Sequence, residues 1–133
     1  MVPMSWTPGI AFGGASVGVT YSLQSGSYVR VGDLVTCFFR LTLTSKGTST
    51  GTVTITGLPF AIAGTSEAYA GSGSLSTSSG LASITGALSS GAGATGASVF
   101  NLFMQGASGN APIADTNITN ALALTGTFTY RAA

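Results

Sequence analysis

Ionised side chains are scarce in this chain of 133 residues. Asp, Glu, Lys and Arg together make up 5% of it, against about 25% of a typical soluble domain. The four basic residues are too few to neutralise a run of phosphates, which excludes an electrostatic nucleic-acid interface. A solitary soluble domain stays dispersed through a mixed, charged surface. The composition therefore predicts that part of this protein's surface is covered in an assembly.

Histidine is absent and cysteine occurs once. The chain therefore cannot build a four-ligand zinc site, and its three acids, Asp33, Glu67 and Asp115, are dispersed along the sequence. Cys37 has no partner for an internal disulfide and no histidine to generate its thiolate, so we expect a buried, inert thiol. No nucleophile is paired with a base. We predict no catalytic residues, no metal and no cofactor, and a protein that is not an enzyme.

Long apolar runs are also missing. No stretch approaches the ~20 apolar residues of a membrane-spanning helix, and the first residues lack the basic and apolar regions of a signal peptide. We expect no membrane insertion. Residues 1–11 contain Pro3, Trp6 and Pro8, whose spacing forbids a helix and predicts an extended arm before a domain of residues 12–133. Two interpretations stay open: Trp6 covers an edge of its own domain, or the arm reaches a neighbouring subunit or a larger scaffold.

Strand patterns are what the chain has in quantity, and residues 21–60 are the part around which the rest is arranged. From Asp33 onward the side chains alternate between two faces, because a strand has a side-chain period of two. One face is wholly apolar and is predicted to lie on the core: Val35, Cys37, Phe39, Leu41 and Leu43. The other face mixes Leu34, Phe38 and Arg40 with threonines. A water-facing strand seldom places Leu and Phe beside Arg, so we predict that this face meets another protein surface.

Other strand patterns precede and follow this one. The predicted strands span residues 10–23, ending at a turn over residues 24–26, and residues 27–31, 52–56, 98–105 and 121–131. Residues 106–120 are predicted to form a loop. Residues 61–96 are rich in Ser, Gly, Thr and Ala, a composition also typical of linkers. Leu81, Ile84 and Leu88 have helical spacing, but the poor helix formers between them favour one or two short strands.

The number of short strands and the absence of a firm helix pattern predict an all-β protein. The predicted fold is an antiparallel β-sandwich or jelly roll, with a closed up-and-down barrel as the second choice.

Three short motifs match functional signatures, but each lacks the context that its chemistry needs. Residues 47–51 (GTSTG) have the spacing of a nucleophile elbow, but a strand pattern follows them and no histidine exists to activate Ser49. Residues 91–96 (GAGATG) have the spacing of a dinucleotide loop, but a strand pattern follows where a helix is required. Asn117-Ile118-Thr119 is a glycosylation sequon without a secretory signal. We interpret all three as loops.

The block YSLQSGSYVRVGDLV, followed by LTLTSKGTSTGTVTITGLPF, resembles a segment of virion surface proteins of tailed bacteriophages, notably the C-terminal heads of tail fibres. The similarity covers residues 12–60, with a weaker echo in TGTFTY at residues 125–130. Residues 26–28 and the final aromatic strand are also similar, at the level of fold only, to trimeric jelly rolls of the complement and tumour-necrosis-factor type. The resemblance implies a β-sandwich head that assembles as a homotrimer on the particle surface.

One departure from the family decides between two roles. A tail-fibre head stands at the end of a long shaft, whereas the domain predicted here begins at residue 12. Small freestanding trimers on phage particles are often decoration or cement proteins, which hold adjacent shell subunits together. We therefore expect a capsid decoration protein that binds the major capsid protein. The alternative is a tail-fibre tip that binds host surface glycan or other tail-fibre proteins, and a third class is a monomeric carbohydrate-binding module unrelated to viruses.

The mechanism in either viral role is binding without chemistry. The predicted subunit contacts are Leu34, Phe38, Arg40, Phe128 and Tyr130. The candidates to grip the shell are Pro3, Trp6 and Pro8. For a fibre tip, recognition would fall to the loops of residues 63–80 and 106–120, where Tyr69 and Asn110 are the candidates to contact sugars.

Overall fold

The computed structural model describes residues 4–64, 71–93 and 96–133. Within these ranges the chain forms antiparallel strands and one short 3-10 helix, η2 (Asp115–Asn117), and no α-helix. The strands are β1 (Met4–Ser5), β2 (Gly9–Phe12), β3 (Val19–Val31), β4 (Leu34–Lys46), β5 (Val53–Thr56), β6 (Ser72–Leu81), β7 (Leu88–Ala92), β8 (Phe100–Gly106), β9 (Gly109–Pro112) and β10 (Ile118–Arg131). The predicted all-β, antiparallel class is confirmed.

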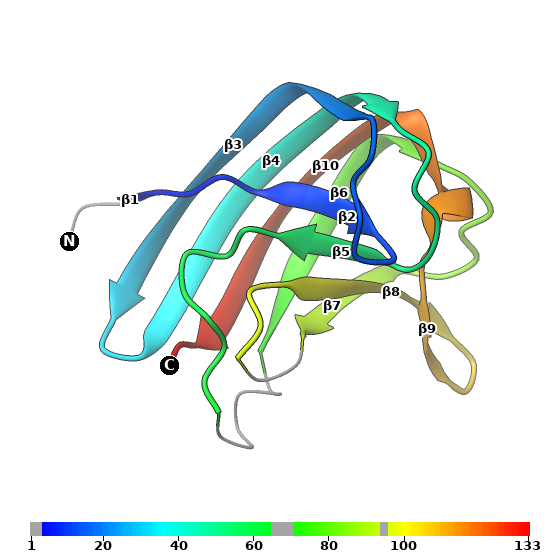
Figure 1. The fold of residues 1–133 in the computed structure, drawn as a ribbon. Coiled ribbons are helices and arrows are strands. Elements are labelled where there is room, and N and C mark those ends of the chain that lie inside the picture. Colours follow the sequence, from blue (N-terminus) through cyan, green and yellow to red (C-terminus); the bar gives the residue numbers. More distant parts are fainter. Residues whose placement is uncertain (1–3, 65–70, 94–95) are drawn as a thin grey trace.

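The strands form a single sheet that curls into a half-barrel. Their order is β1-β3-β4-β10-β6-β7-β8-β5-β2, and β9 forms a hairpin with β8. Figure 1 shows β3, β4, β10 and β6 along one side of the half-barrel, and β2, β5, β8 and β7 along the other. Consecutive strands would be neighbours in an up-and-down barrel, whereas here β10 lies between β4 and β6. The second-choice barrel is therefore wrong, and the jelly-roll topology stays a prediction.

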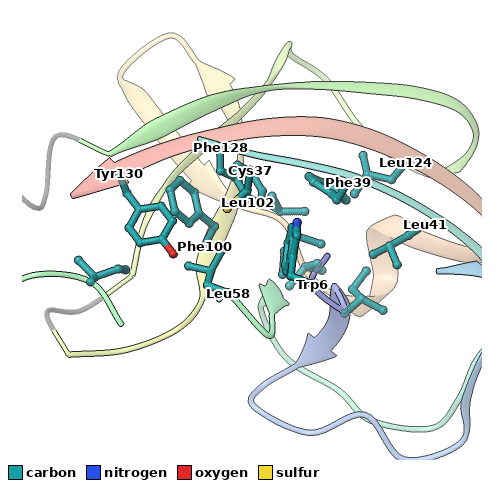
Figure 2. Packing of buried hydrophobic residues seen from close by; sticks show 14 of the residues in the cluster. Trp6, Cys37, Phe39, Leu41, Leu58, Phe100, Leu102, Leu124, Phe128 and Tyr130 are labelled. Atoms are coloured by element: carbon teal, nitrogen blue, oxygen red, sulfur yellow. The ribbon is translucent and has the colours of Figure 1, made fainter. Parts of the chain in front are cut away.

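The core lies inside the curl of the sheet. The inward residues of β4 are all buried, as predicted from their alternation: Val35, Cys37, Phe39, Leu41 and Leu43. From the neighbouring β10, Phe128 stacks on Phe100 of β8, with ring centroids 4.1 Å apart. Figure 2 shows this pair with Tyr130 beside it. Because β10 and β8 belong to opposite sides of the half-barrel, the aromatic cluster joins the two sides.

The N-terminal segment is tied into the sheet rather than standing apart from it. Met4 and Ser5 of β1 pair with β3, and β2 pairs with β5. These two short strands are the edge strands of the sheet, and only residues 6–8 separate them in sequence. In Figure 1 the segment is the blue stretch that runs from β1 to β2. Residues 4–12 therefore bridge the two open edges, and no boundary at residue 11 separates an arm from the domain. We call residues 4–12 the closing segment.

The predicted turn at residues 24–26 is wrong. β3 runs through these residues as one strand, and its register irregularities lie earlier, between Thr20 and Leu23. Gly26 serves a different purpose: a Cβ there would lie 2.6 Å from Nε1 of Trp6. The glycine in the strand therefore marks a close approach by another side chain rather than a chain reversal.

The described part of residues 61–96 contains two strands, β6 and β7, as predicted. β6 pairs with β10, and β7 pairs with β6 and β8. The helix considered for Leu81, Ile84 and Leu88 does not form, because Leu81 ends β6 and Leu88 begins β7. The predicted loop of residues 106–120 was only partly right, since it contains β9 and η2. Its Asn117 is buried and its side-chain amide donates a hydrogen bond to the carbonyl oxygen of Ala82, 3.0 Å away.

Candidate binding face

The outward surface of β3, β4, β10 and β6, which we call the outer face, is the candidate functional site. The strand register aligns its side chains in rows across the sheet, because directly opposite residues point to the same face. One row is Ser27, Phe38, Thr127 and Ser74, and the next is Ser25, Arg40, Thr125 and Ser76. A third row is Val29, Thr36, Thr129 and Ser72, and the last is Val31, Leu34 and Arg131. Hydroxyl side chains therefore surround one aromatic ring and one guanidinium group.

Large apolar side chains on this face are exposed. Phe38 is 48% exposed, Leu34 46% and Val31 60%. Single exposed apolar residues are common, but a group of them on a surface that is otherwise polar and nearly uncharged is typical of an interaction site. The predicted subunit-contact residues Leu34, Phe38 and Arg40 thus lie where another molecule can reach them.

Shallow hollows flank Phe38. One of about 310 Å³ lies on the β3 side of Phe38 and is also lined by Ser27 and Arg40. Another of about 370 Å³ lies on the β10 side and is also lined by Thr127 and Ser74. A third of about 250 Å³ continues past Arg40. Their described lining offers hydroxyls, backbone groups, the aromatic residues Phe38 and Phe39 and the guanidinium of Arg40, so this face is suited to packing and hydrogen bonding.

The charges of the outer face are unevenly satisfied. Arg131 forms an ion pair with Asp33, whose pKa is lowered by the hydrogen bond from that guanidinium. Arg30 of β3 lies on the opposite side of the sheet, since it pairs with the buried Val35, and it covers the ring of Phe60, 4.4 Å from the ring centroid. Arg40 is exposed and, among the described residues, has no hydrogen-bond or ion-pair partner. In the described part of the outer face, it is therefore the cation that is available to another molecule.

Trp6 lies beneath the outer face, on the inner side of the sheet. Its Nε1 donates to the carbonyl oxygens of Ser27 and Phe38, each at 3.0 Å. Its ring meets Phe39 edge-on, with centroids 6.3 Å apart. Figure 2 shows the indole nitrogen pointing toward the sheet. Only 7% of Trp6 is exposed, so of the two interpretations left open for this residue, the structure supports the one in which it covers its own domain.

Pro8, another candidate for binding the shell, is not accessible either. Pro8 is buried, and its carbonyl oxygen accepts a hydrogen bond of 2.6 Å from Nε2 of Gln24. The backbone N–H of Ile10 donates to the hydroxyl of Tyr21 at 3.0 Å. Side chains of β3 thus hold the closing segment across the seam of the half-barrel. Pro3 lies outside the described residues.

Two of the predicted subunit contacts are wrong. Phe128 is 0% exposed and Tyr130 is 2% exposed, both inside the half-barrel. The Tyr130 hydroxyl donates to the carbonyl oxygen of Phe60 at 2.9 Å. An aromatic alternation alone cannot tell a core face from an interface face, and on β10 the aromatic face is the core.

The candidates for sugar contact fall in different places. Tyr69 lies outside the described residues. Asn110 is exposed on β9, and its Oδ1 accepts a hydrogen bond from Nε2 of Gln105 across the β8–β9 hairpin. Figure 1 shows this hairpin projecting away from the half-barrel. Gln105 and Asn110 therefore form a second, smaller polar site, on strands that do not belong to the outer face.

The short motifs lie in the following places. Residues 47–51 connect β4 to β5 as a loop, as predicted, and Oγ of Ser49 accepts a hydrogen bond of 2.9 Å from the backbone N–H of Val17. In residues 91–96 the first two end β7, and residues 94–95 lie outside the described part. Asn117 of the sequon is buried in η2 rather than in an open loop, so its amide is not accessible for modification.

The thiol of Cys37 is fully buried. Burial raises its pKa to about 12, so the predicted unreactive thiol agrees with its surroundings.

This shift makes stability depend on alkaline pH. An unfolded thiol loses its proton near a pH of about 8.5, whereas the folded one keeps it until its pKa of about 12. Between these two pKa values the unfolded state binds fewer protons than the folded state. The contribution of the buried thiol to the free energy of unfolding is therefore fully present below the unfolded pKa and decreases as pH rises above it. We expect the urea midpoint to fall more between about pH 8 and pH 10 in the wild type than in Cys37→Ala. Burial also raises the pKa of Tyr130, with the same sign, but its effect begins above about pH 10. Equal falls in the two proteins would contradict this assignment.

Comparisons with protein-family models, with curated proteins and with solved structures find no match for this chain. Among the described residues, no helix has the length and apolar character needed to cross a membrane. Within the same ranges, no group of three or more His, Cys, Asp or Glu residues is placed to hold a metal ion.

Proposed function

We propose that this chain is a structural protein of the bacteriophage virion surface, a capsid decoration protein that binds the shell as a homotrimer and performs no chemistry. The observation that carries the proposal is the outer face, where Phe38 stands half-exposed between two hollows on a rigid sheet. The resemblance of residues 12–60 to virion surface proteins and the scarcity of charge support the same role. Because Trp6 and Pro8 of the closing segment are buried in their own half-barrel, the grip on the shell is assigned to the outer face and not to Trp6.

Particles assembled without this protein provide the test. We expect purified wild-type protein to bind such particles and to raise the temperature at which they are disrupted, while showing no binding to host cells. Phe38→Ser should weaken particle binding by about tenfold or more, since an exposed aromatic anchor carries a large share of binding energy. Ser108→Ala, at the tip of the β8–β9 hairpin, is the matched control and should bind as the wild type does. Unchanged disruption temperature with saturating protein would contradict the proposal.

The oligomeric state is tested separately. Sedimentation equilibrium at micromolar concentration should give about three times the chain mass of 13.1 kDa. A single species of 13.1 kDa would remove the assembly on which the proposed role depends.

A tail-fibre tip is the second candidate, and the projecting β8–β9 hairpin favours it, since Gln105 and Asn110 offer side-chain amides close to its tip. This role predicts that the protein adheres to host envelopes and competes with infection, and that Asn110→Ala weakens adherence while Phe38→Ser does not. Binding to particles without binding to cells would exclude it.

A further inference from the structure

We propose that the Arg40 end of the outer face binds a carboxylate of a different protein, while Phe38 packs against an apolar side chain beside that carboxylate. The Leu34 end of the same face is left for contact between copies of this chain. This inference deepens the proposed function, because on a virion the different protein would be the shell subunit.

Among the described residues, Arg40 has no anionic partner, and its surroundings are suited to one. It stands in the middle of the sheet, opposite Ser25 of β3 and Thr125 of β10. It lines two of the three hollows and shares one of them with Phe38. A guanidinium presents its donors in a planar fork that matches a carboxylate, and the surrounding hydroxyls can donate or accept the remaining hydrogen bonds. An apolar ring and a cation in one hollow select a partner with an acidic and an apolar group side by side.

A second copy of the chain is poorly equipped to supply that carboxylate. The chain has only three acidic residues. Asp33 is already paired with Arg131, which donates two hydrogen bonds to it, at 2.9 and 2.6 Å. Oδ1 of Asp115 accepts the backbone N–H of Gly51 at 3.0 Å. The remaining acid, Glu67, lies outside the described residues, so the test below includes it explicitly.

Shape points the same way. The core fills the inside of the half-barrel, so the outer face is its convex side (Figure 1). Two copies that met at the middle of their convex faces, over Phe38 and Arg40, would touch along a narrow strip, whereas a stable interface between subunits buries about 800 Å² on each partner. A concave surface or an extended segment of another protein can cover the Phe38 and Arg40 hollows over a larger area.

The Leu34 end has the opposite character. Val31 and Leu34 are exposed there, and the neighbouring Arg131 and Asp33 already neutralise each other. A contact between identical copies at this end therefore needs no counter-charge from the partner. In this proposal the Arg40 end of the outer face binds a different protein, and the Leu34 end contacts another copy of the chain.

Selection of peptides tests the inference without any virion component. A displayed library of random dodecapeptides is panned against the immobilised wild-type protein, and binding of the enriched peptides is measured through the fluorescence of Trp6, whose Nε1 is bonded to the carbonyl of Phe38. We expect the enriched peptides to carry Asp or Glu next to a large apolar residue. Arg40→Gln and Phe38→Ser should each weaken their binding by about tenfold. Arg40→Lys should retain part of it, and Ser108→Asp, which changes net charge by the same amount as Arg40→Gln, should leave it unchanged.

The inference would be overturned if the enriched peptides lacked acidic residues. It would also be overturned if the peptides bound Arg40→Gln with an affinity within twofold of that of the wild type. Loss of self-association in both Arg40→Gln and Glu67→Gln would overturn it as well, because it would assign the carboxylate to a second copy of the chain. Measurement of particle binding distinguishes failure of the carboxylate site from failure of the proposed capsid role. If acidic peptides bind through Arg40 but particles do not bind the wild type, the capsid role fails and the carboxylate site stands. If particles bind Arg40→Gln as they bind the wild type, the capsid role stands and the carboxylate site fails.

Discussion

Replacing Trp6 by alanine is expected to lower the free energy of unfolding by about 3–5 kcal/mol. The substitution empties a buried site and removes the donor to the carbonyl oxygens of Ser27 and Phe38. Those oxygens belong to β3 and β4, so the change reaches the strands that carry the outer face. Since a domain of this size is stable by about 5–15 kcal/mol, the loss is a large share of the total. Urea unfolding of the wild type and the variant measures it.

Two further substitutions separate the volume of Trp6 from its hydrogen bonds. Trp6→Phe keeps most of the ring and loses the N–H, and it should cost about 1–3 kcal/mol for the carbonyl groups left without that donor. Thr7→Ala, at the exposed neighbour in the same segment, should change stability by less than about 0.5 kcal/mol. A wild-type midpoint in Trp6→Ala would mean that the closing segment does not hold the edges of the half-barrel together.

Replacing Phe128 by alanine is expected to cost about 3–5 kcal/mol, because the ring is buried between two others. Its centroid lies 4.1 Å from that of Phe100 and 4.9 Å from that of Phe39. Phe38→Ala is the matched control, since it makes the same change of residue type on the outer face. It should stay within about 1 kcal/mol because the ring of Phe38 is half-exposed. Thermal or urea unfolding distinguishes the two. Equal losses, or a loss of oligomer without a loss of stability in Phe128→Ala, would return Phe128 to the subunit contacts.

The alternation within β4 was enough to predict which of its side chains lie in the core. Alternate residues from Val35 to Leu43 point inward, whereas Leu34, Phe38 and Arg40 point outward. A strand admits only one such division, and neither Gly nor Pro interrupts this strand. The same rule failed to assign Phe128 and Tyr130. Their aromatic face is also regular, but β10 lies in the middle of the sheet, and this position depends on pairing with β4 and β6, which no local pattern encodes.

The role of the N-terminal residues was harder to predict for a similar reason. Pro3, Trp6 and Pro8 correctly indicated an extended segment, but its docking site is built from distant residues. Gly26 looked like part of a turn because glycine is common in turns, whereas it is the space for the indole ring that requires it. In the candidate site, alternation along β4 identified Leu34, Phe38 and Arg40, while the hydroxyl rows on either side of them became apparent only from the pairing register.

The central position of β10 has a consequence for biosynthesis. Of the strands in the described sheet it is the last to be synthesised, yet it carries the ladders to both β4 and β6. Until it emerges, the nascent chain holds two separated groups of strands whose unpaired edges are open to other chains. A premature stop codon before Ile118 would therefore leave two half-sheets and an aggregation-prone product rather than a shortened working domain, because the sheet becomes continuous only once β10 has been made.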